Sequence, residues 1–212
     1  MNKTLLLAFI ALETIESTGS YKFRWDINSG SKASDSSGYQ VKADSPQVEA
    51  IIPFSFTISD LSIDFGTLTP GSFPNPLPTT TLAVSPGGAS GYSVTAFEDH
   101  PLTLQNGSAT IPDTVCNTNA CSETTAGAWT DISKYGFGYN LSGNDIPAGF
   151  INSNYFKQFS NAALSEPPQI IMSSNRAGAN PITTVTYKAN VSTTQTAGDY
   201  ENTIVFIAAP TY

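Results

Sequence analysis

Apolar and polar residues alternate with a period of two near the carboxyl end of the chain. The apolar positions of the first run are Val185, Tyr187, Ala189 and Val191, and those of the second are Ile204, Phe206 and Ala208. This period is typical of a strand with one buried face. The short Thr/Gly/Asp connection between the runs predicts that residues 181–210 form a closing antiparallel hairpin, with these side chains and Tyr200 in the core.

Shorter runs of the same kind recur along the rest of the chain. They cover residues 39–43, 48–58, 61–65, 79–84, 91–97, 135–141, 155–159 and 169–172, and Gly, Pro and Asn separate them. No long stretch repeats apolar residues every 3.6 positions, and the best helix candidate, residues 154–164, is a turn or two long. We therefore predict an all-β fold, an antiparallel β-sandwich of the immunoglobulin-like or jelly-roll-like kind.

One local hairpin stands out between residues 101 and 112. Two short alternating runs flank Asn106 and Gly107. Asn-Gly is the pair that most favours a two-residue type I′ turn, in which both central residues have a positive φ. The sequence therefore predicts a tight hairpin with a type I′ turn at this position.

The amino terminus carries an apolar run with two interpretations. Lys3 precedes the run LLLAFIAL at residues 5–12, and small polar residues follow. A basic start, a short apolar core and a polar exit are typical of a secretory signal peptide that is removed on export. Alternatively, the run stays on the mature protein as a strand buried on both faces. In that case it forms a strand donated to another copy by Leu5, Leu6, Leu7, Phe9, Ile10 and Leu12.

The chain divides into three parts on this evidence. Residues 1–20 form the apolar amino-terminal segment, and residues 21–38 comprise a first strand (21–26) and a Gly/Ser-rich linker (27–38). Residues 39–212 form the β-sandwich domain. The linker would let the amino-terminal segment reach away from its own domain.

Composition narrows the function classes. Only 12% of the residues are charged, the net charge is −8, and the nine Lys and Arg residues are scattered. Without a basic patch the chain has nothing to neutralise phosphates, so we expect no nucleic-acid partner. The apolar run at the amino terminus is shorter than the ~20 residues that a membrane span requires, so we expect no membrane span.

The two cysteines, Cys116 and Cys121, lie five positions apart in VCNTNACSE. A zinc site needs two further ligands, and His100 is the single histidine of the chain. The spacing therefore predicts a local disulfide in an exposed loop, which implies an oxidising compartment.

The sequence predicts no catalytic, cofactor-binding or metal-binding residues, and we expect the protein not to be an enzyme. Glu98, Asp99 and His100 are the single place where two carboxylates meet an imidazole, but Pro101 and a hairpin follow, which favours a solvated loop end. Residues 26–30 resemble the start of a calcium loop but lack its later glycine and acid.

Three aromatic residues lie on one face of the strand predicted at residues 135–141. Tyr135, Phe137 and Tyr139 alternate with glycines. Exposed, such a face could bind sugar rings. Buried, the aromatic rings would fill the core while the glycines allow close packing.

Several segments resemble a known family of bacterial surface domains, the WxL type. The segments are Asp64-Phe65-Gly66, the strand 91–96, and Ala197-Gly198-Asp199-Tyr200 with the following Phe206-Ile207-Ala208 and Pro210. Tyr92-Ser93-Val94 and Phe206-Ile207-Ala208 stand where that family has Trp-x-Leu. The last segment is also similar to the closing strands of pilin-like β-sandwich subunits. These resemblances imply secretion, an all-β fold, attachment to the cell wall, and polymerisation through a donated amino-terminal strand.

Two classes of function agree with these features. The first is a secreted structural protein, a subunit of an extracellular filament or pilus whose partner is another copy of the same chain. The second is a monomeric adhesin or carbohydrate-binding module at the cell surface, whose partners are cell-wall or host glycans. Both place the protein outside the cell.

Overall fold

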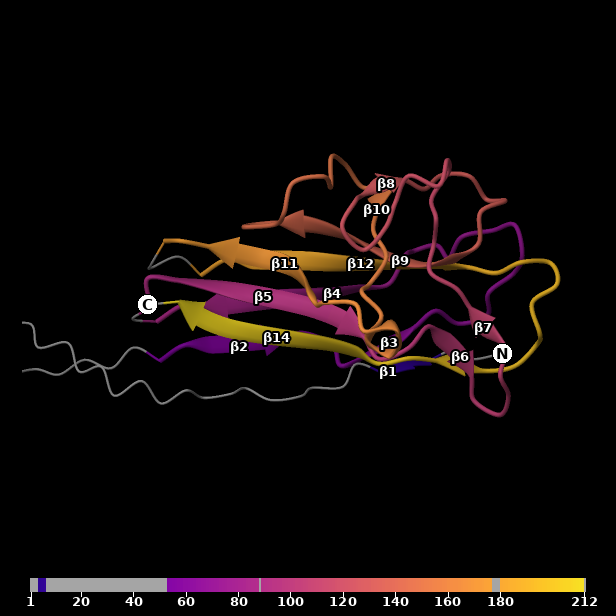
Figure 1. The fold of residues 1–212 in the computed structure, drawn as a ribbon, viewed down its shortest axis with the longest axis horizontal. Coiled ribbons are helices and arrows are strands. Elements are labelled where there is room, and N and C mark those ends of the chain that lie inside the picture. Colours follow the sequence, from indigo (N-terminus) through magenta and orange to yellow (C-terminus); the bar gives the residue numbers. More distant parts are fainter. Residues whose placement is uncertain (1–3, 7–52, 88, 177–179, 212) are drawn as a thin grey trace, which may run out of the picture. The chain divides into compact units, whose positions relative to one another are not determined.

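The computed structural model describes residues 4–6, 53–87, 89–176 and 180–211. The described residues form an all-β fold, as the alternating pattern predicts (Figure 1). The strand expected at residues 21–26, the linker at 27–38 and the run at 39–43 lie outside the described residues.

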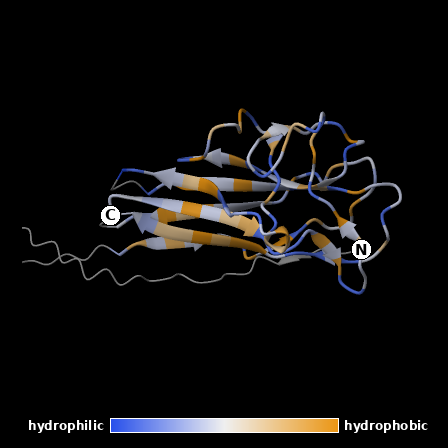
Figure 2. Cartoon of the chain, viewed as in Figure 1, coloured by the Kyte–Doolittle hydropathy of each residue, from blue (hydrophilic) through white to orange (hydrophobic). Residues whose placement is uncertain are grey.

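Two antiparallel sheets make up most of the fold. The first has the order β2–β4–β12–β9, and its strands are β2 (Ser55–Ile58), β4 (Thr79–Ser85), β12 (Ile182–Asn190) and β9 (Gly136–Gly143). The second has the order β11–β5–β14, with β11 (Gln169–Ser174), β5 (Gly91–Glu98) and β14 (Ile204–Thr211). Buried apolar side chains from both sheets form one cluster, as expected for a sandwich (Figure 2).

The predicted closing hairpin is wrong, although both of its strands exist. β12 pairs with β4 and β9, whereas β14 pairs with β5 in the other sheet. The chain therefore crosses from one sheet to the other between them. The predicted burial is confirmed, because Tyr187, Val191, Tyr200, Ile204 and Phe206 are all buried. Alternation reports which face of a strand is buried but not which strand lies beside it.

Three small sheets complete the fold. β1 (Thr4–Leu6) pairs with β3 (Ser62–Asp64), and β8 (Gly127–Ala128) pairs with β10 (Tyr155–Phe156). β13 (Tyr200–Glu201), β6 (Leu102–Leu104) and β7 (Thr110–Ile111) form the third. The helix candidate at 154–164 yields one turn of 3₁₀ helix, η1 (Ala162–Leu164).

The hairpin between β6 and β7 is confirmed, but its turn is not type I′. Leu102 pairs with Ile111 and Thr103 with Thr110, and the Leu104 N–H donates to Ala109 O. The Gly107 N–H donates to Leu104 O at 3.2 Å, so the turn is centred on residues 105 and 106 and the loop is longer than two residues. Neither Asn106 nor Gly107 has the positive φ that a type I′ turn requires.

Aromatic rings fill the centre of the sandwich. Phe159 stacks on Phe137 and Tyr139 of β9, with ring centroids 5.6 and 4.2 Å away, and on Tyr187 of β12 at 6.2 Å. The intervening Gly138 has no room for a side chain, because a Cβ there would lie 2.6 Å from Lys157 O. The Gly-aromatic alternation of β9 therefore serves the core, with rings on one face and close backbone approach on the other.

Substitution of two adjacent residues of β14 tests which face of the strand is buried. Phe206 is 6% exposed and Ile207 is 40% exposed. We expect Phe206→Ala to lower the free energy of unfolding of the monomer by about 3–5 kcal/mol, because truncation removes buried apolar area and leaves a cavity. The matched variant Ile207→Ala should cost less than about 1 kcal/mol. Chemical denaturation measures both, and equal losses would contradict the assigned strand register.

Candidate functional site

The first candidate site is the place where the amino-terminal strand joins the fold. β1 pairs antiparallel with β3, with Thr4 opposite Asp64, Leu5 opposite Ile63 and Leu6 opposite Ser62. Within the described residues β1 is the single strand that pairs with β3. β1 also lies close to β13, the short strand that directly precedes β14 (Figure 1). A segment from the far amino terminus therefore supplies the partner of a strand that begins at residue 62.

The second sheet ends beside this site in an unpaired edge. β14 has eight residues, and along the described part of the chain it forms a ladder with β5 alone. An edge strand of this length exposes a row of backbone N–H and C=O groups that can pair with another strand. Pro210 interrupts the donors near the end of the strand, which leaves most of the edge available.

The residues predicted to form a donated strand are divided between described and undescribed parts. Leu5 and Leu6 belong to β1, and the backbone pairing places them opposite β3. Leu7, Phe9, Ile10 and Leu12 lie outside the described residues. The β1–β3 pairing concerns Thr4–Leu6 alone, so the donated strand stays a prediction.

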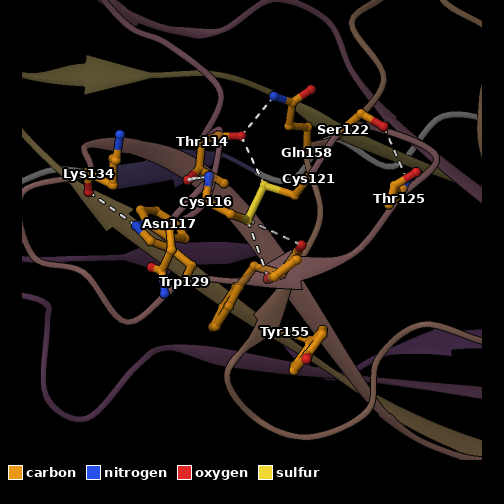
Figure 3. The surroundings of a disulfide bond; sticks show 12 residues. Thr114, Cys116, Asn117, Cys121, Ser122, Thr125, Trp129, Lys134, Tyr155 and Gln158 are labelled. Atoms are coloured by element: carbon orange, nitrogen blue, oxygen red, sulfur yellow. Dashed lines mark hydrogen bonds between the residues drawn. A yellow bond between two sulfur atoms is a disulfide. The ribbon is translucent and has the colours of Figure 1, made fainter. Parts of the chain in front are cut away.

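The predicted disulfide between Cys116 and Cys121 is confirmed. Its predicted exposure is wrong, because Cys116 is 0% and Cys121 7% exposed, although residues 118–120 between them are exposed. The two sulfur atoms lie 3.3–3.6 Å from the carbonyl oxygens of Thr114, Gly127 and Phe156 (Figure 3). The bond is thus part of a second small core, which also contains Trp129 and Phe156.

Polar contacts tie the disulfide loop to its surroundings. Asn117 Oδ1 accepts hydrogen bonds from the backbone N–H groups of Thr130 and Asp131 at 2.8 and 2.9 Å. Gln158 Nε2 donates to Thr114 O at 2.7 Å, and Trp129 Nε1 donates to Lys134 O at 3.1 Å (Figure 3). Because the bonds of Asn117 and Gln158 join residues 13 to 44 positions apart, the loop is an organised lobe and not a free tip.

A buried lysine attaches this lobe to the larger sheet. Lys188 of β12 is 5% exposed, and its Nζ lies 3.5, 4.7 and 4.9 Å from the ring centroids of Phe73, Phe156 and Trp129. The ammonium also donates a hydrogen bond to Trp129 O. Burial lowers the pKa of Lys188 to about 8, while the aromatic faces favour its charged form. Sequence periodicity could not reveal this site, because the rings come from separate segments.

Two of the three candidate side chains near residue 100 lie at the surface, and the third is buried. The Asp99 and His100 side chains are about 40% exposed, with 3.4 Å between Asp99 Oδ2 and His100 Nε2, and Asp99 Oδ1 accepts hydrogen bonds from the backbone N–H groups of His100 and Thr203. The predicted loop end is right for these two residues, but Glu98 is 0% exposed. No group of three or more His, Cys, Asp or Glu residues suited to a metal ion occurs in the described ranges.

Glu98 belongs instead to a buried polar cluster. Its Oε2 accepts a hydrogen bond from Asn202 Nδ2 at 2.8 Å, and its carboxyl group lies within hydrogen-bonding reach of Asp113. Asp113 also lines a surface hollow of about 320 Å³ together with Pro112, Val115, Ser133, Lys134 and Tyr135. This pairing of carboxyl groups was not predicted, because residues 98 and 113 belong to different strands and loops.

The aromatic face of β9 is mostly internal. Phe137 and Tyr139 are 0% and 1% exposed, whereas Tyr135, just before the strand, is 45% exposed. Burial of two of the three rings removes the flat aromatic surface that sugar binding would use. The core interpretation is therefore correct for Phe137 and Tyr139.

Comparison with known proteins identifies no relative. No family model matches the chain, and neither the characterised proteins nor the solved structures contain a match. In the described part of the chain no helix is long and apolar enough to cross a membrane.

The buried disulfide gives a direct chemical test. Without reductant, the protein should show no reactive thiol, folded or denatured, and two after reduction. We expect the double variant Cys116→Ala/Cys121→Ala to lose about 2 kcal/mol of unfolding free energy, since the loop that the bond closes is short. Two reactive thiols in unreduced denatured protein would contradict the assignment.

Proposed function

We propose that the protein is a secreted structural subunit of an extracellular filament, in which the amino-terminal strand of one copy completes the β-sheet of the next. The observation that carries this proposal is the pairing of β1 with β3. It identifies a place in the fold that accepts a strand from the far amino terminus, and backbone hydrogen bonds there supply affinity without requiring a particular side chain.

The direction of β1 indicates where a longer donated strand would continue along the fold. Since Leu6 lies opposite Ser62 in an antiparallel ladder, residues that continue β1 in the same direction pass toward Asp60 and then β2. The next residues in the sequence are Leu7, Ala8, Phe9, Ile10, Ala11 and Leu12. The unpaired edge of β14 follows β13, which is close to β1. Within the described residues β14 has β5 as its single partner, and we propose that the apolar run of another copy fills the free edge.

The spacing along the chain favours exchange between copies. Neighbouring antiparallel strands need only about two to five connecting residues when they pair within one chain. Residues 7–61 separate β1 from its partner β3, which is far more than such a hairpin requires. A connection of this length allows the strand to pair with a second copy, and repetition of that head-to-tail contact produces a filament.

The energetic scale is sufficient for stable assembly. Burial of a large apolar side chain contributes roughly 1.5–3 kcal/mol, so the apolar run could supply on the order of 10 kcal/mol before the costs of ordering and association. The low fraction of charged residues and the internal disulfide also support export to an oxidising extracellular location.

The alternative of a glycan-binding module has less support. It depended on an exposed aromatic face, and of the three rings only Tyr135 is exposed. A single exposed ring beside the hollow at Asp113 lacks the extended platform that stacks on a sugar chain. We therefore retain filament formation as the proposed function.

Deletion of residues 1–17 tests strand donation. The truncated protein should keep its fold, because the sandwich core is formed by residues beyond 53, but it should form no filaments in electron micrographs. The control variant Leu164→Asp changes an equally apolar side chain that is 69% exposed on η1, and it should assemble normally. Filaments of normal form from the truncated protein would refute the proposal.

A peptide experiment separates a missing strand from general misfolding. A synthetic peptide of residues 1–17 added to the truncated protein should bind and raise its melting temperature, because a strand that binds only the folded state stabilises it. A peptide with Leu5 and Leu6 replaced by proline lacks the backbone N–H groups of both residues, so it should have no effect. Equal effects of the two peptides would exclude β-pairing as the mode of binding.

A further inference from the structure

A buried cluster of oxygen atoms at one end of β5 has no role in strand pairing. Glu98 is 0% exposed and Asn202 is 2% exposed, and each has a buried oxygen without a hydrogen-bond donor, Glu98 Oε1 and Asn202 Oδ1. Asp113 Oδ1 is also buried and has no hydrogen-bond donor. Buried polar atoms in native proteins are almost always satisfied, so this concentration requires a physical explanation.

The carboxyl groups of Glu98 and Asp113 lie within hydrogen-bonding reach of each other. Two ionised carboxylates contain acceptors only and would repel at this separation, whereas one proton between them supplies a donor and removes one charge. Asn202 Nδ2 already donates to Glu98 Oε2, which fixes the orientation of the Glu98 carboxyl group. A shared proton therefore accounts for the unpaired oxygen on each acid.

The pair joins three parts of the fold. Glu98 is the last residue of β5, and its N–H donates to Ser160 O at 2.8 Å. Asp113 precedes Thr114, whose N–H donates to Phe137 O of β9 at 2.8 Å. Asn202 lies between β13 and β14, next to Thr203, whose N–H donates to Asp99 Oδ1 and whose carbonyl oxygen accepts from the Asp99 N–H. Repulsion within the pair would thus strain the junction of both sheets.

We propose that Glu98 and Asp113 share one proton at neutral pH, and that this proton acts as a latch that makes the folded protein more stable in mild acid than in alkali. Asp113 gives the latch a route to solvent, because it lines the surface hollow while Glu98 is fully enclosed. The latch regulates the stability of the fold and does not depend on filament assembly.

The surrounding acidic side chains also raise the pKa values of Glu98 and Asp113. Asp99 acts on Glu98, while Glu123 and Glu166 act on Asp113, and all three are acids that disfavour a second negative charge. Lys134 is the cation that lines the hollow beside Asp113. Burial is the largest cause of the raised pKa of both carboxyl groups, and the charge of each acid disfavours ionisation of its neighbours.

The sign of the pH effect follows from linkage. In the unfolded chain these carboxyl groups ionise near their ordinary pKa values of about 4. Because their pKa values are raised in the folded protein, the folded state binds more protons above that pH. The stabilisation is fully present below about pH 4 and is lost as the pH rises toward the raised values.

Thermal unfolding of the full chain tests the latch. The melting temperature of the wild-type protein should fall by about 5 °C or more between pH 5 and pH 8. Glu98→Gln mimics the protonated acid and supplies a permanent N–H donor, so it should remove most of this decrease. The control Glu201→Gln removes the same charge from an exposed side chain and should retain it. An unchanged pH dependence in Glu98→Gln would overturn the proposal.

Infrared spectroscopy of the wild-type protein provides a test that does not require a variant to fold. A protonated carboxyl band should persist at pH 7.5, where ordinary Asp and Glu side chains are ionised. The band should disappear in Glu98→Gln, because Glu98 is the fully enclosed acid and the remaining Asp113, with a pKa of about 6, is ionised at pH 7.5. Absence of the band from the wild-type protein at pH 7.5 would refute the latch.

Discussion

The stacking of Phe159 against both β9 and β12 is the contact on which the rest of this structure depends. Phe159 does not belong to a strand, yet its ring packs against Phe137, Tyr139 and Tyr187. The segment around it therefore cannot move without opening the core. Its neighbours carry the other features: Lys157 O lies against Gly138, Ser160 O accepts from Glu98, and Phe156 contributes to the cage around Lys188.

Two different solutions to buried charge occur on opposite sides of this segment. Lys188 keeps its charge because three aromatic faces and a carbonyl oxygen replace the water that it loses. In the part of the chain that the structure describes, Glu98 pairs with no cation, and the adjacent Asp113 is itself acidic, so neutralisation by a proton is the less costly state. Charged Lys188 thus attaches the disulfide lobe below its lowered pKa of about 8, whereas in our proposal the carboxyl pair loses its stabilising proton as the pH rises.

The β1–β3 pairing connects the fold to the proposed function. A sheet edge that remains open exposes a protein to uncontrolled association, and natural proteins cover or interrupt such edges. Here an apolar segment of the same sequence is available to cover the edge, and the long connection leaves open which copy supplies it. Under the proposed function, the same contact would both build the filament and protect the edge from uncontrolled association.

The sequence alone was sufficient for the elements that depend on local pattern. Alternation predicted β4, β5, β9, β12 and β14 and the burial of Tyr187 and Phe206, and the spacing of Cys116 and Cys121 predicted their bond. Local pattern failed where a partner distant in sequence decides the outcome. It paired β12 with β14 because a short Thr/Gly/Asp connection joins the two runs, and it placed the cysteines in an exposed loop because their segment is rich in turn-forming residues. The Lys188 cage and the Glu98–Asp113 pair are assembled from separate segments, so only the tertiary structure decides them, since burial and charge depend on three-dimensional distance.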